Sequence, residues 1–586
     1  MSSEGSPKKW FGRSPKGSTP AAVTPDSVSE VEQQLDRTTL DDEGEESLTT
    51  ADQLGVADEL QGDTESEQGK FRALLGILRK TLSVKDLSSV RISLPANMME
   101  PIGNLEHWTY IDRPDYFAAL ATPNMSELDR MLAILRWMFT KELKYAKHPI
   151  SKPFNSVLGE HFHCYYDVPV LDLHPKKGHP LPAVHLDENP HPEALVSAGR
   201  TSTGNATAAA SLKNLPTASS VASRSVTSPR SPNAVASSSA SVKSVASTKS
   251  TTSSAAPSSS GSSVRGIAPG SAGTARIVII NEQTSHHPPV SHFVVEARVS
   301  VPGVDEPRIV RCRGVDQLSA KFTGMNVRIV PGPHNKGMFL DLPDGEEVRI
   351  THPTAAVAGL LKASPYATIT DGTTVTVRLP EDGKPGAEKK KKRLRAIVEY
   401  KEESWITRPR FLVEGVVYES FAGEADPSGA VEAGAADEKR FSRIRQVPKD
   451  RVVGTLEGNW RGEIKWKKAG ESTSTTLVDL VPLLVVPKSV APLPDQGPLE
   501  TRRVWSPVVD ALHKKDWNAA SKEKQRIEQE QRDKADERKK KGETYRPRFF
   551  EPEPDNLADW DGRPVLTAEG RAAVERDFRA DYSREP

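Results

Sequence analysis

The sequence has only two cysteines, Cys164 and Cys312, in 586 residues. Two thiols exclude a disulfide framework and a structural zinc cluster, and they fit a reducing compartment. No apolar run approaches the ~18 residues that a membrane-spanning helix needs. The N-terminus, MSSEGSPKKWFGRSP, lacks the apolar core of a secretory signal. These absences predict a cytoplasmic protein.

The chain also lacks an excess of charge of either sign, because 79 lysines and arginines balance 79 aspartates and glutamates. This balance argues against nucleic-acid binding through a bulk positive field. Hydrophobic residues make up 36% of the chain and the mean hydropathy is −0.52. Both values are low for a fully globular chain, so we expect part of it to be disordered.

Two segments have little with which to build a core. Residues 1–68 are acidic and rich in Ser and Pro, and residues 38–69 contain no lysine, arginine or aromatic side chain. Residues 193–273 are dominated by Ser, Ala and Thr, and within them residues 201–270 contain no acid and no aromatic side chain. We expect a disordered tail and a disordered insert, respectively. The insert interrupts a folded domain over residues 69–560, and residues 561–586 form a C-terminal tail.

Helical periodicity marks three places. Residues 126–144 carry an apolar stripe and open with Ser126 and Asp129, a plausible capping pair. Residues 505–538 are helical and dense in charge. Residues 70–82 form a short amphipathic helix with basic flanks, which suits either core packing or a mobile element that touches a membrane. Its apolar face consists of Phe71, Leu74, Leu75, Leu78 and Leu82.

The middle of the chain has the pattern of β-strands. Eight β-branched or aromatic runs are separated by Gly, Pro, Asn and Asp. They are RIVIINEQ, HFVVEARVSV, RIVRCRGV, NVRIV, TVTVRL, RAIVEY, RFLVEGVVYE and NWRGEIKW. Because no helix intervenes, the pattern predicts a large antiparallel sheet or barrel, and with the helices an α+β fold.

The strongest motif is EQTSHHPP at residues 282–289. Its two prolines remove backbone donors, so the strand must end or bend at His286 and His287, which suits recognition of an anion. Three interpretations compete: histidines that only pack, a metal site, and a catalytic pair. A metal site would need ligands such as His161, His163 and Cys164, whose spacing does not support it. A catalytic pair lacks an acidic partner at a fixed spacing.

Two further segments carry charged and polar residues at regular spacings. Lys152 and Asn155 stand three apart at a turn, where both can face one cluster of ligand oxygens. Lys524, Glu528 and Arg532 recur every four residues, so they share one helical face, and Glu528 can pair with either cation. Taken alone, the first segment is more typical of a solvated lysine and the second of a solvated salt-bridge ladder.

Together these segments resemble the oxysterol-binding protein family, whose fingerprint is EQxSHHPP. The resemblance covers nearly all of residues 70–550 outside the insert, including KPFNSVLGE and KDWNAASKEKQRIEQEQRDK. It is that of a short fungal member with the lipid-binding domain only. It implies an incomplete β-barrel around a hydrophobic tunnel, with residues 70–82 as a lid. One departure is Ser156, where the family often has proline.

The resemblance also implies the transfer of a sterol or phospholipid between membranes, often in exchange for phosphatidylinositol 4-phosphate. Carried over by motif position, the headgroup ligands are Lys152, Asn155, His286, His287, Lys524 and Arg532, with Glu528 orienting the two cations. No cofactor or metal is implied. The expected partners are the lipid ligand and anionic membrane surfaces, on which a cytoplasmic monomer docks transiently. The cargo, sterol or a glycerophospholipid such as phosphatidylserine, stays open.

Two other functions compete with lipid transfer. A lipid-regulated scaffold or sensor would use the same site without net transfer. A lipid-ester hydrolase would use His286 or His287 as a base, but the chain has no G-x-S-x-G nucleophile motif. The sequence therefore predicts a binding protein and not an enzyme.

Overall fold

The structure is a computed structural model that describes residues 99–147, 152–171, 273–322, 327–359, 366–378, 392–404, 407–421 and 441–582. The predicted N-terminal tail, the predicted lid helix over residues 70–82 and almost all of the predicted insert lie outside these residues. The first described element is strand β1 (Met99–Gly103). The elements and contacts of the fold are those of these described residues.

The centre of the molecule is a single sheet of 12 strands with the order β18-β17-β16-β15-β14-β13-β10-β9-β6-β5-β4-β3. The strands are β3 (His161–Pro169), β4 (Thr274–His286), β5 (Pro289–Ser300), β6 (Arg308–Asp316), β9 (Met338–Asp341), β10 (Glu347–Ile350), β13 (Gly372–Arg378), β14 (Lys392–Tyr400), β15 (Leu412–Phe421), β16 (Val452–Asn459), β17 (Glu463–Lys468) and β18 (Thr475–Asp479). Every neighbouring pair runs antiparallel. The two end strands are not paired with each other within the described residues, so the sheet is an incomplete barrel. The predicted α+β class is confirmed.

The described residues also form two smaller sheets and several short helices. Strands β1 and β2 (Lys152–Phe154) pair in parallel. A four-stranded sheet has the order β12-β11-β8-β7, with β7 (Leu318–Phe322), β8 (Val327–Pro331), β11 (Thr354–Ala358) and β12 (Tyr366–Thr370). The short helices are α3 (Asn104–His107), α4 (Pro114–Ala118), α6 (Lys144–Lys147), η3 (Ala119–Ala121), η6 (Ile444–Gln446), η7 (Lys449–Arg451), η8 (Leu493–Asp495) and η9 (Leu557–Asp559).

Side chains alternate along the strands as the period of two demands. In β17, Ile464 and Trp466 are buried whereas Lys465 and Lys467 are exposed. The run NWRGEIKW, predicted as one strand, instead crosses the turn between β16 and β17. The other seven predicted runs coincide with β4, β5, β6, β8, β13, β14 and β15.

Strand β3 joins the sheet across a long gap in the sequence. It pairs in register with β4 from His161↔Glu282 to Pro169↔Thr274. Beyond the last pair, the backbone N–H of Val170 donates to the carbonyl of Gly273 at 2.9 Å. The two ends of the segment 172–272, which holds the predicted insert, therefore meet at one place on the sheet.

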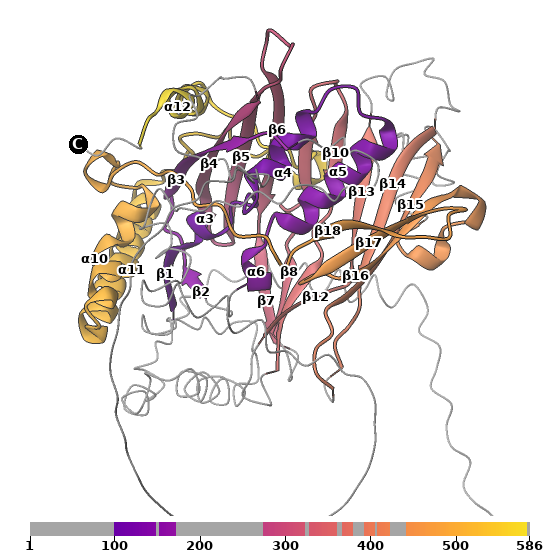
Figure 1. Cartoon of the computed structure of the whole chain (residues 1–586). Helices are drawn as coiled ribbons and strands as arrows, with labels where there is room; N and C mark the ends of the chain where they lie inside the picture. Colours follow the sequence, from indigo (N-terminus) through magenta and orange to yellow (C-terminus); the bar gives the residue numbers. More distant parts are fainter. Residues whose placement is uncertain are drawn as a thin grey trace, which may run out of the picture.

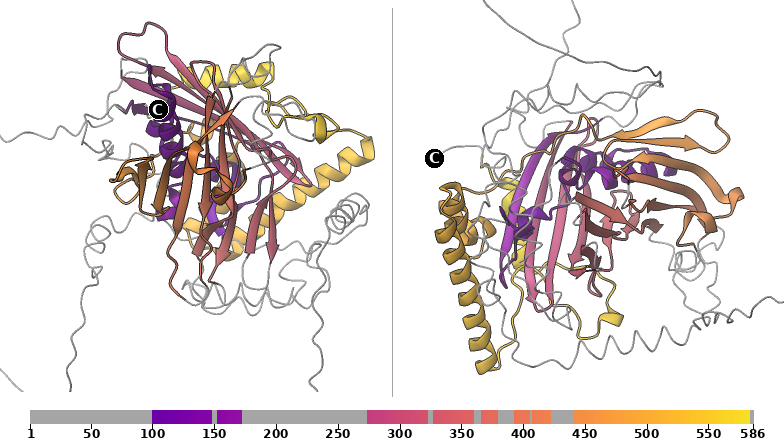
Figure 2. Two further views of the ribbon diagram at one scale, coloured as in Figure 1. Left: turned by 90° about the vertical axis from the view of Figure 1, so that its right-hand side faces the viewer. Right: turned by 90° about the horizontal axis from the view of Figure 1, so that it is seen from below.

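Helix α5 (Glu127–Thr140) begins as predicted, because the Ser126 hydroxyl accepts a hydrogen bond from the backbone N–H of Asp129 at 3.1 Å. Its apolar stripe packs with α4 and with the buried face of the large sheet, and Trp137 lies 5.4 Å from Phe117 between ring centroids. Figure 1 shows α4 and α5 lying across the sheet, and the view from below in Figure 2 shows the strands curving around them. The main hydrophobic core lies between these helices and the sheet.

The predicted helical block over residues 505–538 is two helices. Helix α10 (Thr501–His513) and helix α11 (Trp517–Lys541) form a hairpin, and Lys515 in the turn has a φ of 58°. The pair packs beside β1 and β2 in a second core, at one side of the molecule in Figure 1. None of the helices in the described ranges is both long and apolar enough to cross a membrane.

The C-terminal segment also packs on the sheet. Helix α12 (Ala568–Arg579), in the segment set apart above as a tail, contacts β3 and β4. Its Ala573 and Val574 are buried with Tyr165 and Val278 of those strands. Both cysteines of the chain are buried in the main core, and burial raises the pKa of the Cys164 thiol to about 12 and that of the Cys312 thiol well above its usual range.

Candidate functional site

The segment from Lys152 to Glu160 lies between the large sheet and the α10–α11 hairpin. Strand β2 carries Lys152, whose ammonium group donates to the side-chain oxygen of Asn155 at 3.0 Å. Phe154, two residues later, is fully buried against Trp505 of α10, with which it stacks. The Lys152 and Asn155 side chains therefore lie together, and that both face one cluster of ligand oxygens stays a prediction.

Glu160 is the last residue of this segment. Its buried carboxylate accepts hydrogen bonds from the backbone N–H of Val157 at 2.9 Å, from the Thr501 hydroxyl at 3.0 Å and from the Trp505 indole at 3.2 Å. Burial raises the pKa of Glu160 to about 7, against the opposing effect of these donors. The carboxylate ties the loop after Asn155 to the start of α10.

The EQTSHHPP motif ends one strand and begins the next. Strand β4 runs to His286, β5 begins at Pro289, and these two residues pair across the two-residue turn. His286 is half-buried and His287 is exposed, and their ring centroids lie 4.6 Å apart. The prolines thus act as predicted, because the strand ends at the histidines.

Backbone hydrogen bonds join the histidine hairpin to the lysine segment. The N–H of Gly159 donates to the carbonyl of Gln283 at 2.9 Å, and the N–H of Gln283 donates to the carbonyl of Glu160 at 2.8 Å. This two-way pairing holds the strand that ends at His286 beside the loop that follows Lys152. Two of the predicted segments are therefore neighbours, although the insert separates them in the sequence.

Helix α11 supplies the third predicted segment. Lys524 is buried and its ammonium group donates to the Glu528 carboxylate at 2.7 Å. Burial and the positive charge of Lys524 lower the pKa of Lys152 to about 8, against the opposing charge of Glu528. The structure therefore brings Lys152, Lys524 and Glu528 together from β2 and α11.

Arg532 differs from the pattern expected from its spacing. Its guanidinium donates to the side-chain oxygen of Gln529 at 2.8 and 3.1 Å, and no hydrogen bond or ion pair to Glu528 is described. Glu528 thus engages Lys524, while Arg532 is held by the residue three positions before it. On a helix surface, Arg532 is a neighbour both of Gln529, three positions before it, and of Glu528, four positions before it, so it can bond to either residue.

Of the residues weighed for a metal site, His161 and His163 lie side by side with ring centroids 5.4 Å apart, but Cys164 does not join them. His161 contacts the carbonyl of Gly159 at 3.2 Å, and His163 contacts the Asp577 carboxylate at 3.1 Å. Cys164 belongs to the main core, because neighbours along a strand point to opposite faces. In the parts of the chain that the structure describes, no three His, Cys, Asp or Glu side chains group as metal ligands.

The sequence interpretation missed a polar cluster inside the sheet. The Tyr110 hydroxyl donates to the Asp316 carboxylate at 2.6 Å, and the Lys141 ammonium lies 4.8 Å from the centre of the Tyr110 ring while pairing with Glu142. Burial raises the pKa of Asp316 to about 7. Burial and the charge of Lys141 lower that of His352, whose ring lies 5.6 Å from Tyr110, to about 4. These residues are far apart in the chain, so no local pattern marks them.

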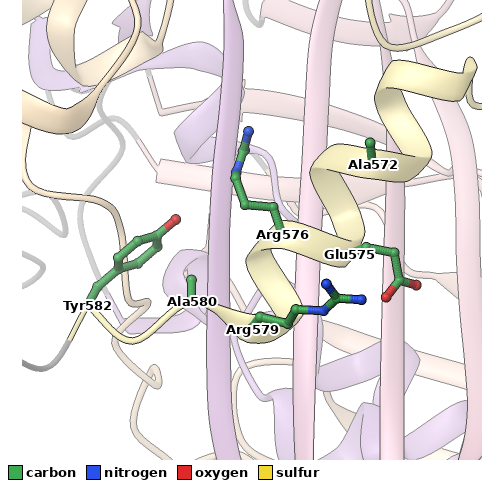
Figure 3. Close-up of a pocket in the computed structure, with 6 residues that line it drawn as sticks. All are labelled: Ala572, Glu575, Arg576, Arg579, Ala580 and Tyr582. Carbon is green, nitrogen blue, oxygen red and sulfur yellow. The ribbon is translucent and has the colours of Figure 1, made fainter.

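A surface pocket of about 590 Å³ lies on α12, outside all of the predicted site residues (Figure 3). It is lined by Ala572, Glu575, Arg576, Arg579, Ala580 and Tyr582. Glu575 already pairs with Arg298, and Arg576 already pairs with Asp577. The pocket therefore adds no group to the lysine and histidine site.

Comparison with known proteins gives a consistent result. The family model described as Oxysterol-binding protein matches residues 73–176 and 506–565. The chain is 38% identical over 526 residues to oxysterol-binding protein-like protein 1 of Schizosaccharomyces pombe, covering 88% of this chain and 93% of that protein. It is 26% identical over 276 residues to the oxysterol-binding protein-like protein OBPa of Candida albicans, covering 47% of this chain and 52% of that protein.

Solved structures align with this chain at lower identity. The ORD of Osh3 from Saccharomyces cerevisiae, in complex with PI(4)P, aligns with a TM-score of 0.45 and 15% identity, covering 86% of this chain and 93% of that one. The Osh1 ORD domain in complex with cholesterol aligns with a TM-score of 0.46 and 15% identity, covering 88% and 98%. On the strength of the sequence similarity that extends along most of its length, this chain belongs to the oxysterol-binding protein family.

Proposed function

We propose that this chain is a lipid-transfer protein that carries a sterol or a glycerophospholipid between membranes and takes phosphatidylinositol 4-phosphate in exchange. In this proposal the headgroup is bound by Lys152, Asn155, His286, His287, Lys524 and Arg532, with Glu528 orienting Lys524. Membership of the oxysterol-binding protein family makes this chain a lipid-binding protein and not an enzyme. His286 and His287 are therefore not assigned the role of a catalytic base.

One observation carries the headgroup assignment. Burial and, to a smaller extent, the positive charge of Lys524 lower the pKa of Lys152, so two cations share one partly buried place. Like charges brought together at a partly buried place destabilise each other, and an anion between them would relieve that repulsion. A phosphomonoester also accepts several charge-assisted hydrogen bonds, which lysine, asparagine and histidine donors can supply.

The energetics of lipid transfer explain why a family of this kind needs an enclosed core. A two-chain lipid exposes about 30 methylene groups to water at about 0.8 kcal/mol each, or on the order of 24 kcal/mol. A curved sheet that closes around the chains removes this cost. The proposed lid over residues 70–82 would complete the enclosure of the lipid chains. The lipid-binding domain would span residues 69–560.

The location of the protein follows from the same proposal. A carrier must leave each membrane, so we propose a monomer that docks transiently on anionic membrane surfaces. The basic run KKKKRLR at residues 389–395 could contribute to docking only in part. Arg393 and Arg395 are buried in β14, whereas Lys392 is exposed and pairs with Glu419.

Extraction from vesicles tests the headgroup site. We expect the parent protein to extract phosphatidylinositol 4-phosphate from phosphatidylcholine vesicles, and the double variant His286→Ala, His287→Ala to lose this extraction while it still takes up sterol or phospholipid. His513→Ala, which removes an exposed histidine at the end of α10, is the matched control. Equal extraction by the double variant and the parent would overturn the assignment.

A second measurement separates a carrier from a lipid-regulated scaffold. Mass spectrometry of the lipids that co-purify with the protein names the cargo, and a donor-to-acceptor vesicle assay measures its net movement. A carrier accelerates that movement in proportion to protein concentration. A scaffold binds the lipid stoichiometrically without moving it.

A further inference from the structure

The hairpin that carries His286 and His287 is held by a second segment besides the lysine segment, and this second segment comes from the C-terminal part of the chain. Glu282 of β4 and His292 of β5 are direct cross-strand partners, a few residues before and after the turn. Cross-strand partners in an antiparallel pair project to the same face of the sheet. Both side chains are almost completely buried, at 0% and 1% exposure. What buries them is the segment Tyr545 to Glu553, which we call the C-terminal strap.

Glu282 is the anchor of this strap. Its carboxylate accepts hydrogen bonds from the Tyr545 hydroxyl at 2.9 Å, from the backbone N–H of Arg548 at 2.7 Å and from the backbone N–H of Phe549 at 2.8 Å. Three donors from one short segment converge on one carboxylate. A buried carboxylate needs such donors, and the buried backbone N–H groups need an acceptor.

His292 fastens the other end of the strap. Its Nε2 lies 2.7 Å from one oxygen of the Glu553 carboxylate, and the other oxygen is 2.5 Å from Nδ1 of His334. Between these two polar contacts, Phe549 and Phe550 are buried against β3, β4 and β5. The strap is therefore held by polar contacts at both ends and by apolar packing in between.

The other neighbour of the hairpin is the lysine segment, whose Gly159 also lies beside the Tyr545 side chain of the strap. Gln283, the residue after Glu282, exchanges backbone hydrogen bonds with Gly159 and Glu160. Its side-chain amide also donates to the carbonyl of Ser285 at 2.7 Å, one residue before His286. Glu282 and Gln283 thus connect the hairpin to two different partners, the strap and the lysine segment.

We propose that Glu282 is a positioning residue for the headgroup site, which it serves by clamping the C-terminal strap onto the hairpin and so fixing His286 and His287 relative to Lys152. The idea rests on the function proposed above and assigns a task to the glutamate of the EQTSHHPP motif. Glu282 does not itself touch the lipid. If the clamp is loosened, the imidazoles must be ordered again each time a headgroup binds, which weakens binding.

The test uses full-length Glu282→Gln. Glutamine keeps the size of the side chain but replaces one acceptor oxygen by an NH2 group that faces donors. Loss of one charge-assisted hydrogen bond predicts extraction of phosphatidylinositol 4-phosphate about ten-fold weaker or more. Uptake of sterol or phospholipid by the same preparation should stay at the parent level. Tyr545→Phe, which removes a single donor and keeps the ring, should give a smaller loss of the same kind.

The matched control is Arg563→Gln. Arg563 pairs with Glu347 of β10, so it tethers the same C-terminal region to the sheet without touching the hairpin. It should extract phosphatidylinositol 4-phosphate like the parent. The proposal is overturned if Glu282→Gln extracts like the parent, or if it loses headgroup lipid and cargo uptake in parallel, because parallel loss means a general structural role.

A second readout needs no lipid. In protein labelled with 13C at the imidazole ring, NMR titration of His286 and His287 reports their surroundings directly. We expect Glu282→Gln and Tyr545→Phe to shift or broaden these two resonances, and Arg563→Gln to leave them unchanged. Unchanged resonances in the first two variants would overturn the positioning role. If the parent extracts no phosphatidylinositol 4-phosphate, the proposed function fails while this measurement still decides the clamp.

Discussion

Phe154 lies flat on Trp505, with ring centroids 4.7 Å apart and ring planes 20° from parallel. Phe154 is two residues after Lys152 on β2, and Trp505 is on α10, which leads into the helix that carries Lys524. The stacked pair therefore joins the strand that carries Lys152 to the helical hairpin that carries Lys524. A hydrophobic contact thus holds together two elements of the proposed polar site.

Replacing Phe154 by alanine should destabilise the protein by about 3–5 kcal/mol, because it leaves a cavity in a closed core. The denaturation midpoint followed by tryptophan fluorescence should fall accordingly. Trp517→Ala, at an aromatic residue that is 37% exposed, is the control and should cost less than half as much. An unchanged midpoint for Phe154→Ala would contradict the packing described here.

Headgroup binding should weaken as the pH rises through about 8, the pKa to which burial and Lys524 lower Lys152. Above that pH the Lys152 ammonium loses its proton and with it the attraction for a phosphate. In Lys152→Arg the cation persists, since arginine stays protonated throughout this range. The alkaline loss should therefore be smaller in this variant.

Vesicle extraction of phosphatidylinositol 4-phosphate between pH 7 and pH 9.5 measures this effect. Lys401→Arg, at a surface lysine that pairs with Glu414, is the control and should keep the parent profile. The same alkaline decline in Lys152→Arg as in the parent would remove Lys152 from the binding site.

Glu160 should make stability depend on pH in the acid range. Its folded-state pKa of about 7 lies above the usual value near 4.5, so the folded protein binds more protons than the unfolded chain between these values. The contribution of Glu160 to stability is therefore fully present at pH 4.5 and below, and it is lost as the pH rises to about 7. In Glu160→Gln this contribution to the pH dependence of the unfolding free energy should disappear.

Urea unfolding at a series of pH values between 4.5 and 7.5 checks this expectation. The test compares how steeply the free energy of unfolding changes with pH in the parent and in Glu160→Gln. A constant destabilisation of the glutamine variant therefore does not affect it. Parallel slopes for the two proteins would show that Glu160 titrates normally.

The lid prediction concerns residues outside the described part of the chain. Removing residues 1–82 should leave a cooperatively folding domain that binds membranes but retains and transfers its apolar cargo poorly. The reason is the amphipathic face of Phe71, Leu74, Leu75, Leu78 and Leu82, which needs cover in water. Transfer at the full-length rate would refute a lid, and failure to fold would return this helix to the core.

Local patterns in the sequence identified much of the fold. The helix that begins at Ser126 has a regular apolar stripe and a capping pair, and both are properties of adjacent residues. The same holds for β4 and for the turn at His286, where two prolines dictate the end of the strand. Such features need no knowledge of distant contacts.

The parts that the sequence could not reveal all depend on distant contacts. Strand β3 pairs with β4 across the segment that holds the predicted insert, and Tyr110 reaches Asp316 from 206 positions away. Nothing next to Glu282 in the sequence indicates that the strap will bind it. The resemblance identified candidate residues for one site, but the clamp that holds them emerges only when segments separated in the chain pack together.

The burial of Cys164 and Cys312 has a practical consequence for studying how such a protein opens. Thiols with strongly raised pKa values react slowly with maleimides, because the thiolate is the nucleophile. A single cysteine introduced on the surface would therefore be labelled selectively without first removing the native ones. If residues 70–82 form the predicted lid, a fluorophore attached in this way at Arg79→Cys, off the apolar face, would report its opening and closing in real time.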